Sequence, residues 1–190
     1  MDNLLKYIHS LSPLSEGSWQ LLQTALSQRV FRKNQLLLKE GQVCNYLFYI
    51  DSGYCRSYYE IDGQEKNTGF FFENDIVTNL DSFGSGQKAA GNIIACETLT
   101  AILFDKEKLF LVAKESAEIE ALGRCCIRLF ASKQEAFSRL LRLYSARERL
   151  EYIEKNYPHL LQRVPLTQLA SFLGIARETL SRIRKRRMLH

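Results

Sequence analysis

Long apolar runs are absent from this sequence. The longest, such as residues 36–38 and 70–72, fall far short of the roughly 20 residues that a membrane-spanning helix needs. Asp2, Lys6 and His9 interrupt the apolar residues at the N-terminus, so the chain also lacks the apolar core of a signal peptide. We therefore expect a cytoplasmic protein without a membrane partner.

Metal-binding and catalytic motifs are absent as well. The five cysteines form no CxxC pair and the three histidines are scattered, so we expect no metal site, no cofactor and no disulfide framework. Free thiols are expected instead, with adjacent Cys125 and Cys126 as the one candidate pair for a redox switch. No Gly-rich phosphate loop, GxSxG or HExxH occurs, which argues against an enzyme.

The positive charge is confined to one end of the chain. Of the 26 basic and 21 acidic residues, six basic and one acidic lie in residues 177–190. The whole net charge of +5 therefore belongs to this segment, and the rest of the chain is neutral. Such a distribution predicts that a polyanion binds at the C-terminal end.

The secondary structure that the sequence indicates changes twice, from helix to strands near residue 29 and back to helix near residue 106. Residues 1–28 have helical spacing, with a second helical segment around Trp19, Leu22 and Leu26 after a break at Ser12 and Pro13. Residues 29–105 are β-rich, and the Asp62-Gly63 pair is a strong hairpin signal. We expect strands at residues 35–39, 46–51, 54–61, 69–72, 92–97 and 101–104. Strands at this spacing without intervening helices favour an antiparallel sandwich or barrel.

The longest helix is expected at residues 116–143. Apolar residues recur there at spacings of three and four, interrupted by Lys133. The stripe comprises Ile119, Leu122, Cys126, Leu129, Ala136 or Phe137, and Leu140. It needs a partner surface, either the β domain of its own chain or a second copy, and a dimer is favoured because it would also suit the polyanion-binding C-terminal end.

Residues 166–184 have the spacing of two helices that cross over a short turn. Ala170 provides the small side chain that the crossing requires, and Gly174 suits a turn that needs a positive φ. The seam between the helices is expected at Leu169, Leu173, Ile175, Leu180 and Ile183. Such a helix-turn-helix reads the major groove of DNA, whereas the alternative is an ordinary helical hairpin with a solvated basic face.

The sequence resembles the cyclic AMP receptor protein/FNR superfamily of bacterial regulators over nearly its whole length. The string from Gly174 to Ile183, GIARETLSRI, is similar to the family pattern Gly-x-[Ser/Thr]-Arg-Glu-Thr-x-x-Arg-x. Gly41, Gly53 and Asp75 match the β-roll of the family more weakly. The resemblance implies an α+β protein: a jelly-roll domain with N-terminal helices at 1–115, a dimerisation helix at 116–143 and a helix-turn-helix domain at 144–190. The chain ends just past the recognition helix, as in short members without a β-wing.

The resemblance also assigns roles on the second helix. Arg177 and Arg182 would bond guanines and Glu178 a cytosine amino group, which suits the chemistry of those bases. Thr179 would contact phosphate. Ala176 departs from the family's capping Ser/Thr. The full expected DNA-binding set is Arg177, Glu178, Thr179, Ser181, Arg182 and Lys185. It predicts a two-fold symmetric operator with half-sites similar to TGTGA, centred roughly 34–36 Å apart.

Family members that respond to cyclic AMP bind it in an effector pocket of the β-roll. This sequence lacks the residues that hold cyclic AMP there. The Gly-Glu pair that holds the ribose corresponds to Thr78 and Asn79, and the Arg-Ser pair that grips the phosphate corresponds to Ala89 and Ala90. Lys88 is the only nearby cation, and it lacks the arginine fork. Cysteines for an iron–sulfur cluster and a β-region histidine for haem are also missing. The pocket either takes an unknown small molecule or serves as a scaffold.

The sequence therefore predicts a homodimeric transcriptional regulator that binds double-stranded DNA. An activator would also need RNA polymerase as a partner, and no residue pattern for that contact is visible. The alternative is a β-roll sensor whose basic C-terminus binds RNA or an acidic protein.

Overall fold

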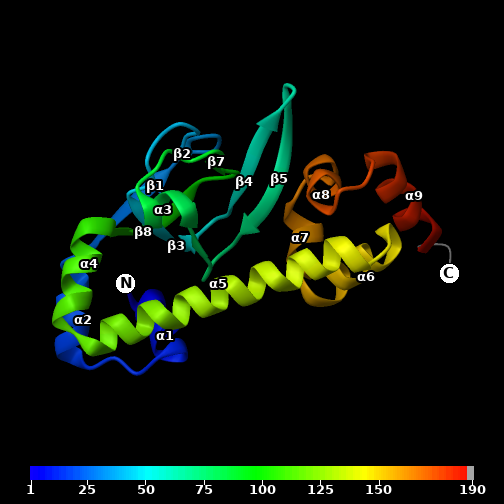
Figure 1. Ribbon diagram of the computed structural model, residues 1–190. Helices are drawn as coiled ribbons and strands as arrows, with labels where there is room; N and C mark the ends of the chain where they lie inside the picture. Colours follow the sequence, from blue (N-terminus) through cyan, green and yellow to red (C-terminus); the bar gives the residue numbers. More distant parts are fainter. Residues whose placement is uncertain (188–190) are drawn as a thin grey trace. The chain divides into compact units, whose positions relative to one another are not determined.

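The computed structural model describes residues 1–187, with side chains as far as Ile183. The chain divides into two compact units. The first comprises Met1–Ser57 and Phe70–Phe130, and the second comprises Tyr58–Gly69 and the residues from Ala131 onward. Apart from one short helix among the strands, helices and strands occupy separate stretches of the described chain, as in the α+β class (Figure 1).

The strands form two sheets, and the pairs β1–β8, β8–β3, β3–β6 and β2–β7 are antiparallel. One sheet has the order β1 (Leu26–Phe31), β8 (Leu99–Asp105), β3 (Tyr46–Ser52) and β6 (Ile76–Val77). The other has the order β2 (Leu36–Leu38), β7 (Asn92–Ala95), β4 (Cys55–Ile61) and β5 (Gln64–Phe71). The order departs from that of the sequence, as a jelly-roll requires.

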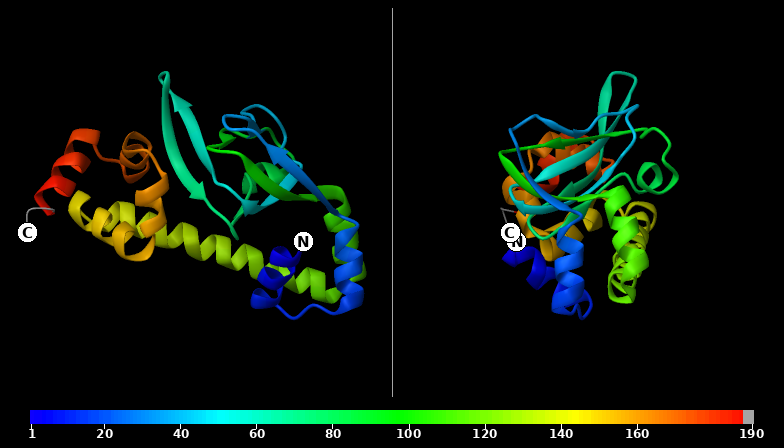
Figure 2. Two further views of the ribbon diagram at one scale, coloured as in Figure 1. Left: turned by 180° about the vertical axis from the view of Figure 1, so that it is seen from behind. Right: turned by 90° about the vertical axis from the view of Figure 1, so that its left-hand side faces the viewer.

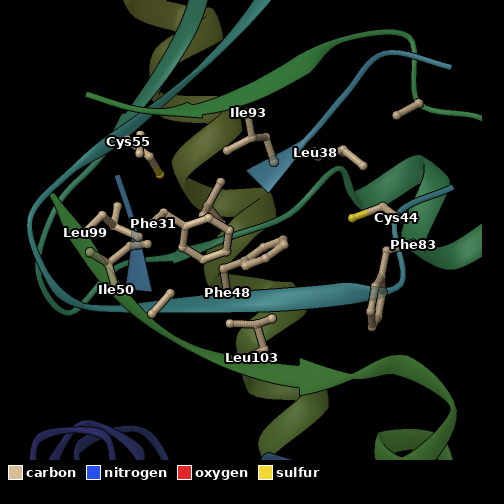
Figure 3. Close-up of a cluster of buried hydrophobic side chains, with 14 residues drawn as sticks. Phe31, Leu38, Cys44, Phe48, Ile50, Cys55, Phe83, Ile93, Leu99 and Leu103 are labelled. Carbon is tan, nitrogen blue, oxygen red and sulfur yellow. The ribbon is translucent and has the colours of Figure 1, made fainter. Parts of the chain in front are cut away.

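Apolar side chains from both sheets fill the space between them. Phe31 and Phe48 come from the first sheet and Cys55 and Ile93 from the second, and all are buried in one cluster (Figure 3). The alternation of side chains along each strand explains this arrangement, since every second residue points to the same face. The antiparallel sandwich expected from the sequence is confirmed.

Two glycine positions in this region are fixed by backbone geometry. Gly53 has φ of 83°, and a Cβ there would lie only 2.5 Å from the carbonyl oxygen of Thr98. Asp62 and Gly63 have φ of 52° and 70°, as a two-residue type I′ turn between β4 and β5 requires. The hairpin predicted from the Asp-Gly pair is therefore confirmed.

Helices cover one side of the first sheet (Figure 2). They are α1 (Asp2–Leu11), α2 (Glu16–Gln23), α4 (Lys106–Glu115) and the first part of α5 (Ala117–Leu143). Leu4, Trp19 and Val112 of these helices pack with Tyr49 and Ile102 of the sheet in a second buried cluster. Among the described residues, no helix is long and apolar enough to cross a membrane.

The second unit consists of helices and most of the β4–β5 hairpin, Tyr58–Gly69. Its helices are the end of α5, then α6 (Ala146–Asn156), α7 (Pro158–Arg163), α8 (Leu166–Leu173) and α9 (Arg177–Arg187). Phe137 of α5 lies with its ring centre 5.2 Å from that of Phe172 and 5.9 Å from that of Tyr157. This aromatic cluster joins α5 to α8 within the unit.

Three expectations about the elements need correction. Leu26 was expected in a helix but is the first residue of β1, paired with Phe104. A short helix, α3 (Leu80–Ser85), separates β6 from β7, although no helix was expected among the strands. The local sequence of α3 contains Gly84 and two serines, so its helical signal is weak, and Asn79 and Gly86 cap its ends.

The third correction concerns the packing of the apolar stripe of α5. The helix itself is confirmed, but Ile119 and Leu122 are buried in the core of the first unit and Leu140 is buried in the second. The stripe therefore packs largely within its own chain, the alternative that the sequence favoured less. Ile127 and Leu129, in the middle of the helix, are exposed.

Candidate nucleic-acid interface

Helices α8 and α9 pack through the seam that the sequence predicts. Leu169, Leu173 and Leu180 are 0–1% exposed, and Ala170 is 2% exposed where the helices meet. Ile175 and Ile183 are half-buried. Because the small side chain of Ala170 allows close approach, the two short helices form a packed pair rather than two independent segments.

The turn between the helices depends on Gly174. Its backbone is left-handed, with φ of 65° and ψ of 34°, and its N–H donates to the carbonyls of Ala170 and Ser171. The N–H of Ile175 also donates to Ala170 at 3.0 Å. These bonds satisfy carbonyls at the end of α8 and direct the chain into α9.

The outward face of α9 carries the predicted contact residues. Arg177, Glu178 and Arg182 are exposed, whereas Thr179 and Ser181 are half-buried. Lys185 belongs to the same helix, but its side chain lies outside the described residues. Glu178 and Arg182 lie four residues apart and so share a face of α9, and Arg177 precedes Glu178 at the start of the helix, so α9 exposes two guanidinium groups and one carboxylate.

Sequence reasoning missed a set of contacts between α8 and strand β5. The hydroxyl of Ser171 accepts a hydrogen bond from the backbone N–H of Asn67 (3.1 Å) and donates to the carbonyl of Glu65 (3.2 Å). The side chain of Asn67 also donates to the carbonyl of Gln168 (3.4 Å). Residues 65–67 belong to β5, an edge strand, whose outward backbone groups are available for such bonds (Figure 1). No local pattern predicts a contact between residues that lie so far apart in the sequence.

In the β-roll, the residues at the predicted ribose-binding positions have structural partners. The hydroxyl of Thr78 donates to the carbonyl of Tyr46 (3.1 Å) and lies 3.3 Å from the sulfur of Cys44. The side chain of Asn79 accepts from the backbone N–H of Ser82 and so caps α3. Both side chains stabilise the local fold.

The predicted phosphate-binding positions carry no buried cation. Ala89 is 3% exposed and belongs to the sandwich core, where its backbone bonds to Gly41 and Gln42 at 2.8 Å. Ala90 and Lys88 are exposed. Arg56 is buried, but it follows Cys55, which points into the sandwich, so its side chain points to the opposite face of the sheet. Among these positions, none offers a cation to an anion held between the sheets.

The β-roll matches a known domain family. Residues 28–116 match the family model of the cyclic nucleotide-binding domain. Among curated proteins, none matches the chain.

Solved structures share the fold over most of the chain. FixK2 from Bradyrhizobium japonicum is 19% identical, with a TM-score of 0.68, and the match covers 85% of this chain and 83% of that one. The c-di-GMP responsive global regulator CLP from Xanthomonas campestris is 20% identical, with a TM-score of 0.65 and 92% of each chain covered. A chain from Eubacterium rectale assigned to the crp/fnr family is 17% identical, with a TM-score of 0.71, and 93% of this chain and 84% of that one are covered.

Proposed function

We propose that this chain is a transcriptional regulator of the Crp/Fnr type that binds a two-fold symmetric DNA operator as a homodimer. The observation that carries the proposal is the exposure of Arg177 and Arg182 in the first turns of α9, the helix that follows the turn at Gly174. A guanidinium pairs with the O6 and N7 atoms of guanine through two hydrogen bonds. The basic residues that follow in α9 would neutralise phosphates and make binding strongly salt-dependent.

The proposed roles follow the geometry of α9. Arg177, Glu178 and Arg182 would reach base edges, whereas Thr179, Ser181 and Lys185 would contact the backbone. Residues 1–115 would form the effector domain, residues 116–143 the dimerisation helix and residues 144–190 the DNA-binding domain. In this proposal the protein is cytoplasmic and is not an enzyme. If it activates transcription, it would also bind RNA polymerase.

The effector pocket is proposed to be degenerate toward cyclic AMP. A cyclic phosphate bound between the sheets needs a buried cationic donor, and Ala89 and Ala90 provide none. Thr78 and Asn79 are engaged in local bonds, which also leaves the ribose without its ligands. The β-roll then either accepts a different small molecule or serves as a scaffold for α5.

Selection of bound duplexes from a random DNA pool tests the proposal. The wild-type protein should recover a two-fold symmetric site, and Arg177→Ala or Arg182→Ala should each lose preference at one base position, at a cost of about 1–3 kcal/mol. Arg32→Ala is the matched control, because Arg32 is an exposed arginine outside α8 and α9. It should leave the recovered sequence unchanged.

Two outcomes would contradict the proposal. Retention of single-stranded RNA and heparin as tightly as duplex DNA would instead favour a module that binds polyanions through its charge alone. An unchanged sequence preference in both arginine variants would remove α9 as the reading element.

A further inference from the structure

The guanidinium group of Arg149, in α6, bonds three backbone carbonyls at once. Nε donates to Tyr144 (2.9 Å), Nη2 to Leu141 (2.6 Å) and Nη1 to Leu173 (2.8 Å). Leu141 lies in the last turn of α5 and Tyr144 follows that helix directly, whereas Leu173 is the last residue of α8. One side chain therefore joins the ends of two helices that are far apart in the sequence.

The chemistry of helix ends explains why an arginine is placed there. The last four carbonyls of a helix have no partner inside it, and they carry a partial negative charge. A planar guanidinium offers five N–H donors in a fixed fork, so it can serve several carbonyls in directions set by its own plane. A lysine ammonium keeps the charge but has no such fork.

The contact at Leu173 is also a contact with the turn that leads into α9. A Cβ added to Gly174 would lie 3.6 Å from Nη1 of Arg149, so the guanidinium lies against this turn. Helix α9 begins three residues later, at Arg177. The direction in which α9 leaves the turn is thereby set against the end of α5.

We propose that Arg149 is a positioning residue that fixes the direction of α9 relative to α5, and with it the half-site spacing that the protein accepts. This inference rests on the proposed function, in which two copies pair through α5 and each inserts α9 into DNA. In such a dimer the separation of the recognition helices depends on the angle between α5 and α9 within each copy. Arg149 controls spacing without touching a base.

Binding to duplexes of altered spacing tests this role. The probes are the symmetric site recovered by the wild-type protein, the same site with one or two base pairs added or removed at its centre, and a duplex with one half-site. Arg149→Lys and Arg149→Gln are compared with Arg147→Lys. Arg147 is a suitable control, because it is an exposed arginine of the same helix whose Nε bonds Glu151 at 3.0 Å.

The wild-type protein and Arg147→Lys should prefer one spacing strongly. The Arg149 variants should bind the single half-site within about twofold of wild type but lose about tenfold or more on the best two-site duplex, because simultaneous engagement depends on geometry. Their affinities for the different spacings should converge.

Three outcomes would overturn the proposal. The first is an unchanged spacing preference in both Arg149 variants. The second is loss of half-site binding in both variants, which would show that Arg149 is needed for folding rather than direction. The third is a wild-type protein that binds the half-site but has no preferred spacing, which removes the role of Arg149 and leaves DNA binding intact. A wild-type protein that binds no duplex overturns this inference and the proposed function together.

Discussion

The thiol of Cys126 is half-buried beside Cys125 in α5, and this position governs its chemistry. Burial, with a smaller contribution from the neighbouring Cys125, raises the pKa of Cys126 to about 11. Because the thiolate is the reactive form, Cys126 should be far less reactive at neutral pH than an ordinary cysteine. The side chain of Cys125 donates to the carbonyl of Leu11 at 3.6 Å, which also engages its sulfur. The pair therefore has the properties of structural thiols more than of a redox switch.

Alkylation of Cys126 tests this view. In a Cys125→Ser variant at pH 7.5, iodoacetamide should modify Cys126 at least about tenfold more slowly than in the same protein unfolded in urea, because burial, the larger cause of the raised pKa, remains in this variant. Mass spectrometry of the peptide that carries Cys126 gives the rate. Equal rates in the folded and unfolded protein would restore the redox interpretation.

The start of α6 shows how one element is fixed at its end. Ser145 and Glu148 form a capping box: the Ser145 hydroxyl accepts from the backbone N–H of Glu148, and the Glu148 carboxylate accepts from the backbone N–H of Ser145 at 2.8 Å. The carboxylate also accepts from the Ser145 hydroxyl at 2.7 Å. These bonds, from the side chain and then the backbone of Ser145, lower the pKa of Glu148. The next residue of α6 is Arg149, the positioning residue proposed above.

The lowered pKa predicts the sign of a pH effect. A carboxyl group with a depressed folded pKa contributes stability above its ordinary pKa, and this contribution is lost as the pH falls through the folded value. Ser145→Ala should return the pKa of Glu148 toward 4.5, as followed by NMR titration of its carboxyl carbon. The difference in unfolding midpoint between wild type and variant should be larger at pH 7 than at pH 3.

Ser85→Ala is the control for this effect. The Ser85 hydroxyl donates to the backbone carbonyl of Asp81 and accepts from the N–H of Gln87, so no carboxylate depends on it. Its effect on the unfolding midpoint should not change in the same way with pH. An unaltered pKa of Glu148 in Ser145→Ala would show that the capping box does not hold the carboxylate in solution.

At the scale of the whole molecule, the proposed function requires two copies. Most of the apolar stripe of α5 is used inside the chain, but Ile127 is 58% exposed in the middle of the helix. Exposed Arg124 and Arg128 and half-buried Ala121 lie near it and line the same surface hollow. A second α5 would cover the exposed apolar side chain of Ile127 in the proposed dimer.

Substitution of Ile127 tests the dimer. Ile127→Glu should weaken self-association by about tenfold or more, because a carboxylate would be buried in an apolar interface. Sedimentation equilibrium measures the change. Leu111→Glu is the matched control, since Leu111 is also 58% exposed but lies on α4. Self-association that is equal in both variants and wild type would exclude this face of α5 as the interface.

Much of the fold was accessible from the sequence because its signals are local. Short β-rich segments bounded by turn residues predict most strands, and the Asp62-Gly63 pair predicts the hairpin. The spacing of Ala170, Gly174 and Leu180 predicts the crossing of α8 and α9, since each residue acts through its immediate neighbours. The positive charge of residues 177–190 is a property of composition and needs no coordinates.

The tertiary structure decided what depends on distant parts of the chain. The stripe of α5 could face its own chain or a second copy, and only the packing of Ile119, Leu122 and Leu140 shows that it is largely internal. The bonds of Ser171 to the β4–β5 hairpin and of Arg149 to two helix ends join backbone groups that have no signature in the side-chain pattern. Backbone carbonyls and N–H groups are the same at every position except proline, which lacks the N–H, so their distant partners are determined only when the helices and strands pack together.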